Sequence, residues 1–283
     1  MTSLLCDIIH AASLQLVRIA ENPQREARLL MAHVLETSYE EIYFANDRPL
    51  TADEEAHFKR LLKRRLNKEP LSKIRGYREF WSRIFCVTAD TLDPRPDSEI
   101  IIQAVLDHFP DKTQNYRILD LGTGTGCLLL TLLSEYPQAT GVGVDLSEAA
   151  ALIAKENARR HHLETQASFI VGNWGEAISA KFNIIISNPP YIALHESLSK
   201  EVVDFDPSLS LFAGIDGLEC YRALAEQIPN LMTSSSKAFL EIGKDQLSDV
   251  IQIFSNSYMQ GTRRDIQNYE RCVIFSRKTT PVK

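Results

Sequence analysis

The chain has 283 residues, of which 44% are hydrophobic and 24% charged, and its net charge is −6. This composition is typical of a folded globular protein and excludes an intrinsically disordered chain, and the length predicts one large domain of roughly 200 residues and a smaller one. The acidic balance argues against extensive nucleic-acid binding.

The five cysteines are scattered, without a Cys-x-x-Cys pair or a histidine cluster at metal-binding spacing. We therefore expect a reducing compartment and no metal site. No signal peptide is expected, because Asp7 and His10 interrupt the first apolar residues, and no run approaches the roughly 20 apolar residues of a membrane span. The sequence thus predicts a soluble cytoplasmic protein without a membrane partner. We also expect a monomer.

Three amphipathic helices are predicted in the first 70 residues. Apolar residues recur at spacings of three and four over residues 5–19, which places them on one helix face. Asn22 and Pro23 are suited to begin a second helix, and Thr51 with Glu54 can form a capping box for a third. These helices predict a small helical bundle.

The third helix, expected to run to about residue 68, is unusually basic. Its basic residues are Lys59, Arg60, Lys63, Arg64, Arg65 and Lys68. They can contact an acidic partner, but a solvated helix face with basic side chains lying over neighbouring leucines is the favoured interpretation.

A hairpin and a stiff linker are predicted between the bundle and the rest of the chain. Apolar residues on both sides of Ser82-Arg83 favour a hairpin between residues 76 and 87. Two prolines within residues 93–96 favour an extended linker, and Asp97 or Ser98 is suited to cap the helix that follows.

Beyond residue 97 the predicted strands and helices alternate. Strands are expected at residues 117–121, 139–145, 168–171, 183–187 and 237–242, and helices at residues 126–136, 147–161 and 218–228. Such alternation predicts an α/β fold with a doubly wound, mostly parallel, Rossmann-like sheet, which binds ligands at the carboxyl ends of its strands.

A glycine-rich loop over residues 120–126 follows the first of these strands and opens a helix, so its backbone can approach a ligand closely. A dinucleotide fingerprint would require glycine or alanine where Cys127 stands. Asp145 ends the next strand and is placed to accept both hydroxyls of a ribose. Trp174 can enclose an adenine ring, although a role in the core is equally compatible with its position. This pattern predicts an adenosine site, which both nicotinamide enzymes and methyltransferases possess.

The motif at residues 188–191 decides between these two classes. It consists of Asn188, Pro189, Pro190 and Tyr191 and follows an apolar strand. The prolines stiffen the turn and remove backbone donors, which leaves an amide, free carbonyls and an aromatic ring that suit a planar NH2 group. A dehydrogenase has no use for such a turn, whereas a methyltransferase acting on an amino group needs one beside its methyl donor.

An amide nitrogen is a poor nucleophile because its lone pair is delocalised, so orientation must contribute much of the catalysis. Asn188 Oδ1 and the Pro189 carbonyl can each accept one amide hydrogen and orient the nitrogen for near-attack contact at about 3 to 3.5 Å. Both acceptors strengthen as charge develops on the nitrogen. Tyr191 can stack on the amide.

Together these motifs resemble the release-factor glutamine N5-methyltransferases, also called the HemK family, over nearly the whole chain. The resemblance rests on Glu69-Pro70-Leu71, Pro94-Arg95-Pro96, residues 120–127 and 188–192, Asp216-Gly217-Leu218, Glu241-Ile242-Gly243, and Asp265 with Arg271. It implies methylation, by S-adenosylmethionine, of the glutamine in the Gly-Gly-Gln loop of bacterial class I peptide release factors. S-adenosylhomocysteine would be the product.

The resemblance also implies domains and site residues. A substrate-recognition domain is expected at residues 1–72, a hairpin linker at 73–96 and a catalytic methyltransferase domain at 97–283. The implied cofactor-binding residues are Gly122, Thr123, Gly124, Thr125, Gly126, Asp145, Trp174 and Asn188. The implied substrate-binding residues are Asn188, Pro189, Pro190 and Tyr191, of which Asn188, Pro189 and Tyr191 are the expected catalytic residues. The chain departs from the family pattern at Lys73, Asp93, Asn173, Asn183 and Asn268.

Three alternatives remain at this point. The same turn suits an exocyclic amine of adenine or guanine in nucleic acid, since a flipped base can stack on a tyrosine. A binding protein that keeps the cofactor fold without catalysis is less favoured, because loop, acid and turn are all intact. A nicotinamide dehydrogenase is the least favoured.

Overall fold

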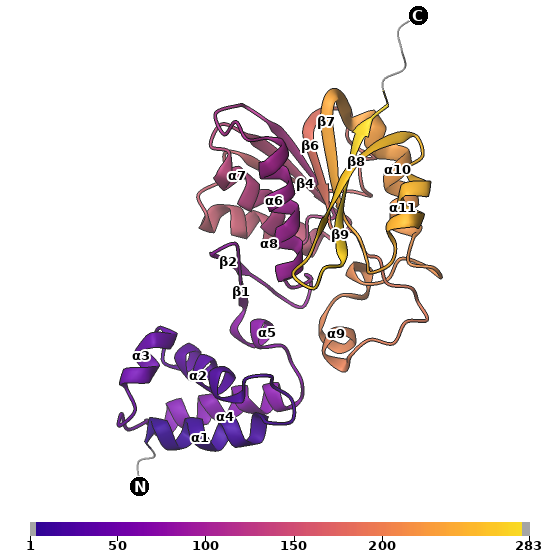
Figure 1. Ribbon diagram of the computed structural model, residues 1–283. Helices are drawn as coiled ribbons and strands as arrows, with labels where there is room; N and C mark the ends of the chain where they lie inside the picture. Colours follow the sequence, from indigo (N-terminus) through magenta and orange to yellow (C-terminus); the bar gives the residue numbers. More distant parts are fainter. Residues whose placement is uncertain (1–3, 279–283) are drawn as a thin grey trace, which may run out of the picture. The chain divides into compact units, whose positions relative to one another are not determined.

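The computed structural model describes residues 4–278, and the chain forms two compact units (Figure 1). The first unit contains the described residues up to 76 together with 198–205, and the second contains residues 77–197 and those from 206 onward. The outer ends of the expected first and last domains, residues 1–3 and 279–283, lie outside the described residues.

The first unit is helical. Its helices are α1 (Leu5–Leu16), α2 (Pro23–Val34), α3 (Tyr39–Phe44), α4 (Ala52–Leu66), α5 (Leu71–Arg75) and α9 (Lys200–Phe205). The three predicted helices are confirmed, and so are the two predicted caps, since the Asn22 side chain accepts from the Arg25 amide and Thr51 with Glu54 forms a capping box. The prediction omitted α3, α5 and α9. Of these, α3 begins with a further capping box at Ser38.

Arg65 departs from the predicted solvated face of α4. Its side chain is 6% exposed and forms ion pairs of 2.6 Å with Glu26 of α2 and 2.6 Å with Glu201 of α9. Guanidinium can bind two carboxylates at once because it presents several N–H donors in one plane. Arg65 therefore joins a segment far along the chain to the helices of the first unit.

We expect Arg65→Ala to loosen the first unit around α9. Removing one partner of a buried ion pair costs about 3–5 kcal/mol, and we expect about 2–3 kcal/mol here because Glu201 can regain hydration. Hydrogen exchange of the amides in residues 200–205 and in α4 measures the loss. Arg60→Ala, at an exposed position of the same helix, is the matched control. Equal protection in both variants would contradict the role of Arg65.

The second unit begins with the predicted hairpin, formed by β1 (Tyr77–Phe80) and β2 (Arg83–Cys86). Its turn was predicted one residue too late. Trp81 and Ser82 occupy the turn, with φ of 50° and 55°, although such a turn normally selects asparagine or glycine. Trp81 is stabilised there because its backbone N–H donates to Glu99 and its indole N–H donates to Glu135.

A seven-stranded sheet forms the centre of the second unit, in the order β5-β4-β3-β6-β7-β9-β8. Its strands are β3 (Arg117–Leu121), β4 (Thr140–Asp145), β5 (Ala167–Val171), β6 (Phe182–Ser187), β7 (Met232–Glu241), β8 (Ser257–Arg264) and β9 (Glu270–Arg277). The other elements are η1 (Pro96–Ser98), α6 (Glu99–His108), α7 (Cys127–Glu135), α8 (Glu148–Arg160), η2 (Ser208–Ser210), α10 (Glu219–Leu231) and α11 (Leu247–Ile253). All neighbouring strands from β5 to β7 are parallel, whereas β9 is antiparallel to both β7 and β8. The predicted Rossmann-like α/β fold is confirmed.

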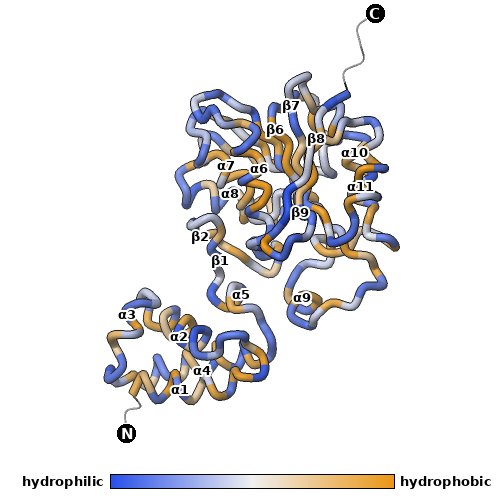
Figure 2. Tube along the Cα trace, viewed as in Figure 1, coloured by the Kyte–Doolittle hydropathy of each residue, from blue (hydrophilic) through white to orange (hydrophobic). Residues whose placement is uncertain are grey.

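Helices cover both faces of the sheet, with α6, α7 and α8 on one face and α10 and α11 on the other (Figure 1). Side chains alternate between the faces along each strand. In β6, Ile184 and Ile186 pack in the cluster that contains the α6 and α7 side chains, while Ile185 packs with those of α10. The central strands consequently read as continuous hydrophobic segments, as the colouring along β6 shows (Figure 2).

Ser147 caps α8 as predicted, since its side chain accepts from the Ala150 amide. The prediction that Asp97 or Ser98 caps α6 is wrong. Ser98 stands at the N-cap position but makes no side-chain cap bond, because a 3₁₀ turn precedes the helix and the serine hydroxyl donates elsewhere. None of the helices in the described part of the chain is long and apolar enough to cross a membrane.

Candidate active site

A cavity of about 400 Å³ lies at the carboxyl ends of β3, β4, β5 and β6 in the second unit. Most of the site residues predicted from the sequence line it: Gly122, Thr123, Gly124, Thr125, Asp145, Trp174, Asn188 and Pro190. The fold thus brings together side chains that are up to 68 positions apart, because parallel strands end at the same edge of the sheet. Gly126, Pro189 and Tyr191 do not line the cavity.

The glycine loop turns sharply after β3. Gly122 and Gly124 have φ of +78° and +54°, which residues with a Cβ rarely adopt. A Cβ on Gly122 would lie 3.2 Å from the Trp174 ring, so the bare glycine lets this ring approach the loop. A Cβ on Gly126 would meet Ala154 of α8, also at 3.2 Å. Gly126 therefore allows the loop to pack closely against α8, and it does not line the cavity.

Asp145 ends β4 with both carboxylate oxygens oriented by backbone amides. The Gly124 N–H donates to Oδ2 at 2.8 Å, and the Ser147 N–H donates to Oδ1 at 2.9 Å. Each carboxylate oxygen can accept more than one hydrogen bond. Asp145 is thus fixed at the cavity wall with acceptor capacity remaining for two hydroxyl groups.

Asp120 lies behind the loop and was not singled out as a site residue. It is 1% exposed, its Oδ2 accepts from the Thr123 hydroxyl at 2.7 Å, and burial raises the pKa of its carboxyl to about 7. The hydrogen bond joins the end of β3 to the glycine loop. The sequence signals for Asp120 were its position at the end of a buried strand and its place in the motif at residues 120–127.

The four residues of the turn at 188–191 have different surroundings. Asn188 and Pro190 line the cavity, and Pro189 is buried beside them. Tyr191 packs against the core on the α10 side, and burial raises the pKa of its phenol. Its hydroxyl donates to Glu241 Oε1 at 3.4 Å. The amide of the turn therefore faces the cavity, while the phenol reaches a buried carboxylate.

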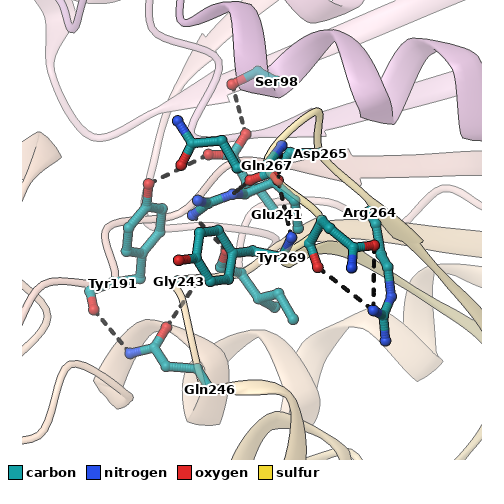
Figure 3. Close-up of polar contacts among 12 residues, drawn as sticks. Ser98, Tyr191, Glu241, Gly243, Gln246, Arg264, Asp265, Gln267 and Tyr269 are labelled. Atoms are coloured by element: carbon teal, nitrogen blue, oxygen red, sulfur yellow. Dashed lines mark hydrogen bonds and ion pairs between the residues drawn. The ribbon is translucent and has the colours of Figure 1, made fainter.

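A chain of hydrogen bonds connects Asn188 to that carboxylate. Asn188 Nδ2 donates to Ser98 Oγ at 3.0 Å, and Ser98 Oγ donates to Glu241 Oε2 at 2.5 Å. Figure 3 shows Ser98 and Tyr191 reaching the Glu241 carboxylate from different segments of the chain. Sequence reasoning did not assign a site role to Ser98 or Glu241. The sequence signals for Glu241 were its place at the end of an apolar strand and in the Glu241-Ile242-Gly243 motif of the family resemblance.

Gln246 and Gly217 support the turn from behind. Gln246 Nε2 donates to the Tyr191 carbonyl at 2.9 Å, while its Oε1 accepts from the Gly243 N–H at 3.0 Å (Figure 3). Gly217 has φ of +74°, and a Cβ there would lie 2.5 Å from the Tyr191 carbonyl oxygen. The turn therefore depends on two residues from outside its own segment.

Comparisons with known proteins show which sequences this chain resembles. One family model, described as Methyltransferase small domain, matches residues 97–204, and another, described as PrmC N-terminal domain, matches residues 7–76. A release factor glutamine methyltransferase of Rhodospirillum rubrum is 41% identical over 91% of this chain and 80% of its own length. One of Agrobacterium fabrum is 39% identical over 86% of each chain. The chain belongs to the release factor glutamine methyltransferase family.

As a member of the release factor glutamine methyltransferase family, the chain is an S-adenosylmethionine-dependent methyltransferase.

The residues at which the sequence is expected to depart from the family pattern lie in several places. Asn173 and Asp93 line the cavity, and Lys73 lies on α5. Asn183 accepts from the Arg117 N–H at 2.8 Å. Asn268 has φ of +67°, in the left-handed region that asparagine adopts more readily than most residues with a Cβ.

Proposed function

We propose that the protein transfers a methyl group from S-adenosylmethionine to the side-chain amide nitrogen of the glutamine in the Gly-Gly-Gln motif of class I peptide release factors. The observation that carries this proposal is that Asn188 lines the same cavity as the glycine loop and Asp145. This shared lining supports an arrangement in which an amide-holding side chain lies beside an adenosine site. All of these residues come from one chain, so we propose that the enzyme is monomeric. We also propose that it is cytoplasmic, as expected from the sequence.

The cavity suits S-adenosylmethionine. Its volume of about 400 Å³ falls within the range of about 300–1,000 Å³ typical of small-molecule sites. We propose that Asp145 accepts the ribose hydroxyls, that Trp174 flanks the adenine, and that residues 122–125 approach the ligand through their backbone. Bound there, S-adenosylmethionine supplies an electrophilic methyl group on a sulfonium sulfur.

The protein's own contribution to the reaction is orientation. Asn188 Oδ1 accepts no hydrogen bond from the described residues, and neither does the Pro189 carbonyl. We propose that these two oxygens accept the two hydrogens of the substrate amide, although Pro189 is not among the residues that line the cavity. The amide nitrogen is then held in one plane with its π face presented to the methyl group. Positive charge developing on the nitrogen strengthens both hydrogen bonds, which lowers the barrier selectively.

The turn is rigid enough for this task. Prolines fix two φ angles, Gln246 donates to the Tyr191 carbonyl, and Tyr191 reaches Glu241. Its acceptors therefore keep their positions before the substrate arrives. Because preorganised acceptors need no reorganisation during the reaction, they stabilise the transition state more than flexible ones would.

We expect Asp145→Ala to weaken S-adenosylmethionine binding about 10²-fold, since a hydrogen bond to a charged group contributes about 1.5–3 kcal/mol. The variant removes the proposed ribose acceptor and also the carboxylate that accepts from the Gly124 and Ser147 amides. Isothermal titration calorimetry measures the change. Asp107→Ala, at a side chain 61% exposed, is the matched control. Unchanged affinity in the Asp145 variant would place the ribose elsewhere.

Incubation with radiolabelled S-adenosylmethionine and a release factor tests the proposed function. We expect label to enter the release factor and to be absent when the Gly-Gly-Gln glutamine is replaced by alanine. RNA and DNA are supplied in parallel reactions. Label in the alanine-substituted factor would refute the acceptor residue, and label only in nucleic acid would favour an exocyclic base amine as substrate.

A further inference from the structure

Ser98 is placed where a serine would ordinarily cap a helix, yet its hydroxyl is used elsewhere. It is 2% exposed and precedes α6 without capping it. Its oxygen instead accepts from Asn188 Nδ2 at 3.0 Å and donates to Glu241 at 2.5 Å. A cap bond contributes about 1 kcal/mol, so this arrangement gives up local helix stability.

We propose that Ser98 and Glu241 are positioning residues that determine which end of the Asn188 amide faces the substrate. This inference rests on the proposed function, because it concerns the orientation of the side chain that would accept the glutamine hydrogen. Neither residue touches the substrate in this proposal. Both act through the hydrogen bonds that end on Asn188.

The donor and acceptor properties of these groups fix the direction of each hydrogen bond. An ionised carboxylate only accepts hydrogen bonds, so the Ser98 hydroxyl must use its single proton toward Glu241. The Ser98 oxygen is then left as an acceptor, which selects the NH2 end of Asn188. Because the two ends of an amide lie on opposite sides, Oδ1 is directed away from Ser98. The relay, meaning the hydrogen bonds from Asn188 to Ser98 and from Ser98 to Glu241, thus leaves Asn188 Oδ1 available for the substrate amide.

The reverse polarity would disable the site. A protonated Glu241 can donate to the Ser98 oxygen, and Ser98 can then donate to an amide oxygen. That exchange favours an Asn188 amide rotated by 180°, which would present N–H groups to the N–H groups of the substrate. The catalytic orientation consequently depends on the ionised state of Glu241.

Glu241 has surroundings that place its ionisation near neutrality. The carboxyl is almost fully buried, and burial raises its pKa to about 7, opposed by the hydrogen bond from Ser98 and the nearby positive charge of Arg271. The groups that act on it from the packed elements are Asp97 and Ser98 of η1, Tyr191 after β6, Tyr221 of α10, Cys127 of α7, and Arg271 and Cys272 of β9.

Nuclear magnetic resonance of the Asn188 side-chain NH2 group tests the relay without any substrate. Signals are assigned by their loss in Asn188→Ala. We expect them to shift with a midpoint near pH 7 because Glu241 has its pKa raised to about 7 by burial. Glu241→Gln should abolish that titration. Ser98→Ala should change the signals at every pH. Asn188 signals that are the same in wild type, Glu241→Gln and Ser98→Ala at every pH would overturn the proposal, whether or not the protein methylates release factors.

Steady-state kinetics provide the second test. We expect Ser98→Ala to lower kcat about 10- to 100-fold, comparable to loss of one orienting hydrogen bond, with KM values changed less than about threefold. Wild-type kcat should fall below pH 7, and Glu241→Gln should remove that acid limb. Glu241→Gln also shows whether Glu241 causes the loss of kcat at low pH. The distinction is needed because burial raises the pKa of Asp120 to about 7 as well.

Ser134→Ala is the matched control, because its hydroxyl donates to the Leu130 carbonyl within α7 and lies outside the relay. Wild-type kcat in the Ser98 variant, together with an unchanged acid limb in Glu241→Gln, would overturn the proposal. If the Ser98 variant does not fold, the Glu241→Gln pH profile decides alone. Absence of methylation by the wild type would instead refute the proposed function and leave the resonance test standing.

Discussion

Replacing Asn188 with alanine is expected to lower kcat for release-factor methylation about 10²- to 10³-fold, the range seen when one preorganised hydrogen-bonding group is removed from an active site. The substrate amide would lose one of its two proposed acceptors and rotate away from the attacking geometry. S-adenosylmethionine affinity is expected to change less than about fivefold, because most of the proposed cofactor contacts come from other segments. Single-turnover kinetics and calorimetry separate the two effects.

Asn183→Ala provides a control on β6, the strand that precedes Asn188. Asn183 accepts from the Arg117 backbone at the opposite end of β6, so its loss should leave turnover near the wild-type value. Unchanged turnover in Asn188→Ala would show that the substrate amide is held by other residues. A parallel loss of cofactor affinity and rate would instead mean that Asn188 serves the methyl donor.

Gly217→Ala is expected to impair catalysis about as strongly, although Gly217 does not line the cavity. A Cβ there would lie 2.5 Å from the Tyr191 carbonyl oxygen and 3.1 Å from Gln246 Nε2. The turn must shift to relieve this overlap, and a displacement near 1 Å can lower the rate about 10²-fold. Methylation assays at saturating substrates measure the effect.

Gly76→Ala separates the overlap from backbone strain. Gly76 has φ of +77°, close to the +74° of Gly217, but a Cβ there meets nothing within 4 Å. Both substitutions should therefore carry the left-handed cost of about 1–2 kcal/mol, visible in thermal unfolding. Only the Gly217 variant should lose methylation. Equal loss in both variants would attribute the effect to destabilisation and not to the turn.

The sequence was sufficient for the elements whose signals are local. The strand Arg117–Leu121 has the predicted bounds, and Asn22 and Thr51 cap their helices as predicted. The β8–β9 hairpin was not predicted because Ser257–Arg264 has mostly exposed or half-buried residues and lacks a strong alternation of polar and apolar side chains. The Trp81-Ser82 turn was misplaced because contacts from Glu99 and Glu135 override the usual residue preferences.

Site prediction shows the same division. Asp145 ends a strand and Gly122 and Asn188 directly follow strands, so the fold class alone brings them to one edge of the sheet. Ser98 and Glu241 are 143 positions apart in the sequence, yet they are hydrogen-bonded in the structure. No local sequence pattern pairs them. Serine before a helix predicts a cap, and only the three-dimensional neighbours of its hydroxyl reveal another use.

The ion pair between Arg65 and Glu201 has a consequence for dissecting this enzyme. Because residues 198–205 belong to the first unit, the chain passes between the units after residues 76, 197 and 205. A fragment ending at residue 76 would lack the carboxylate that Arg65 binds on α9. A fragment starting at residue 77 would carry α9 without its native neighbours. Neither half is therefore a self-contained module, and a single cut at residue 76 cannot divide the protein into its two folding units.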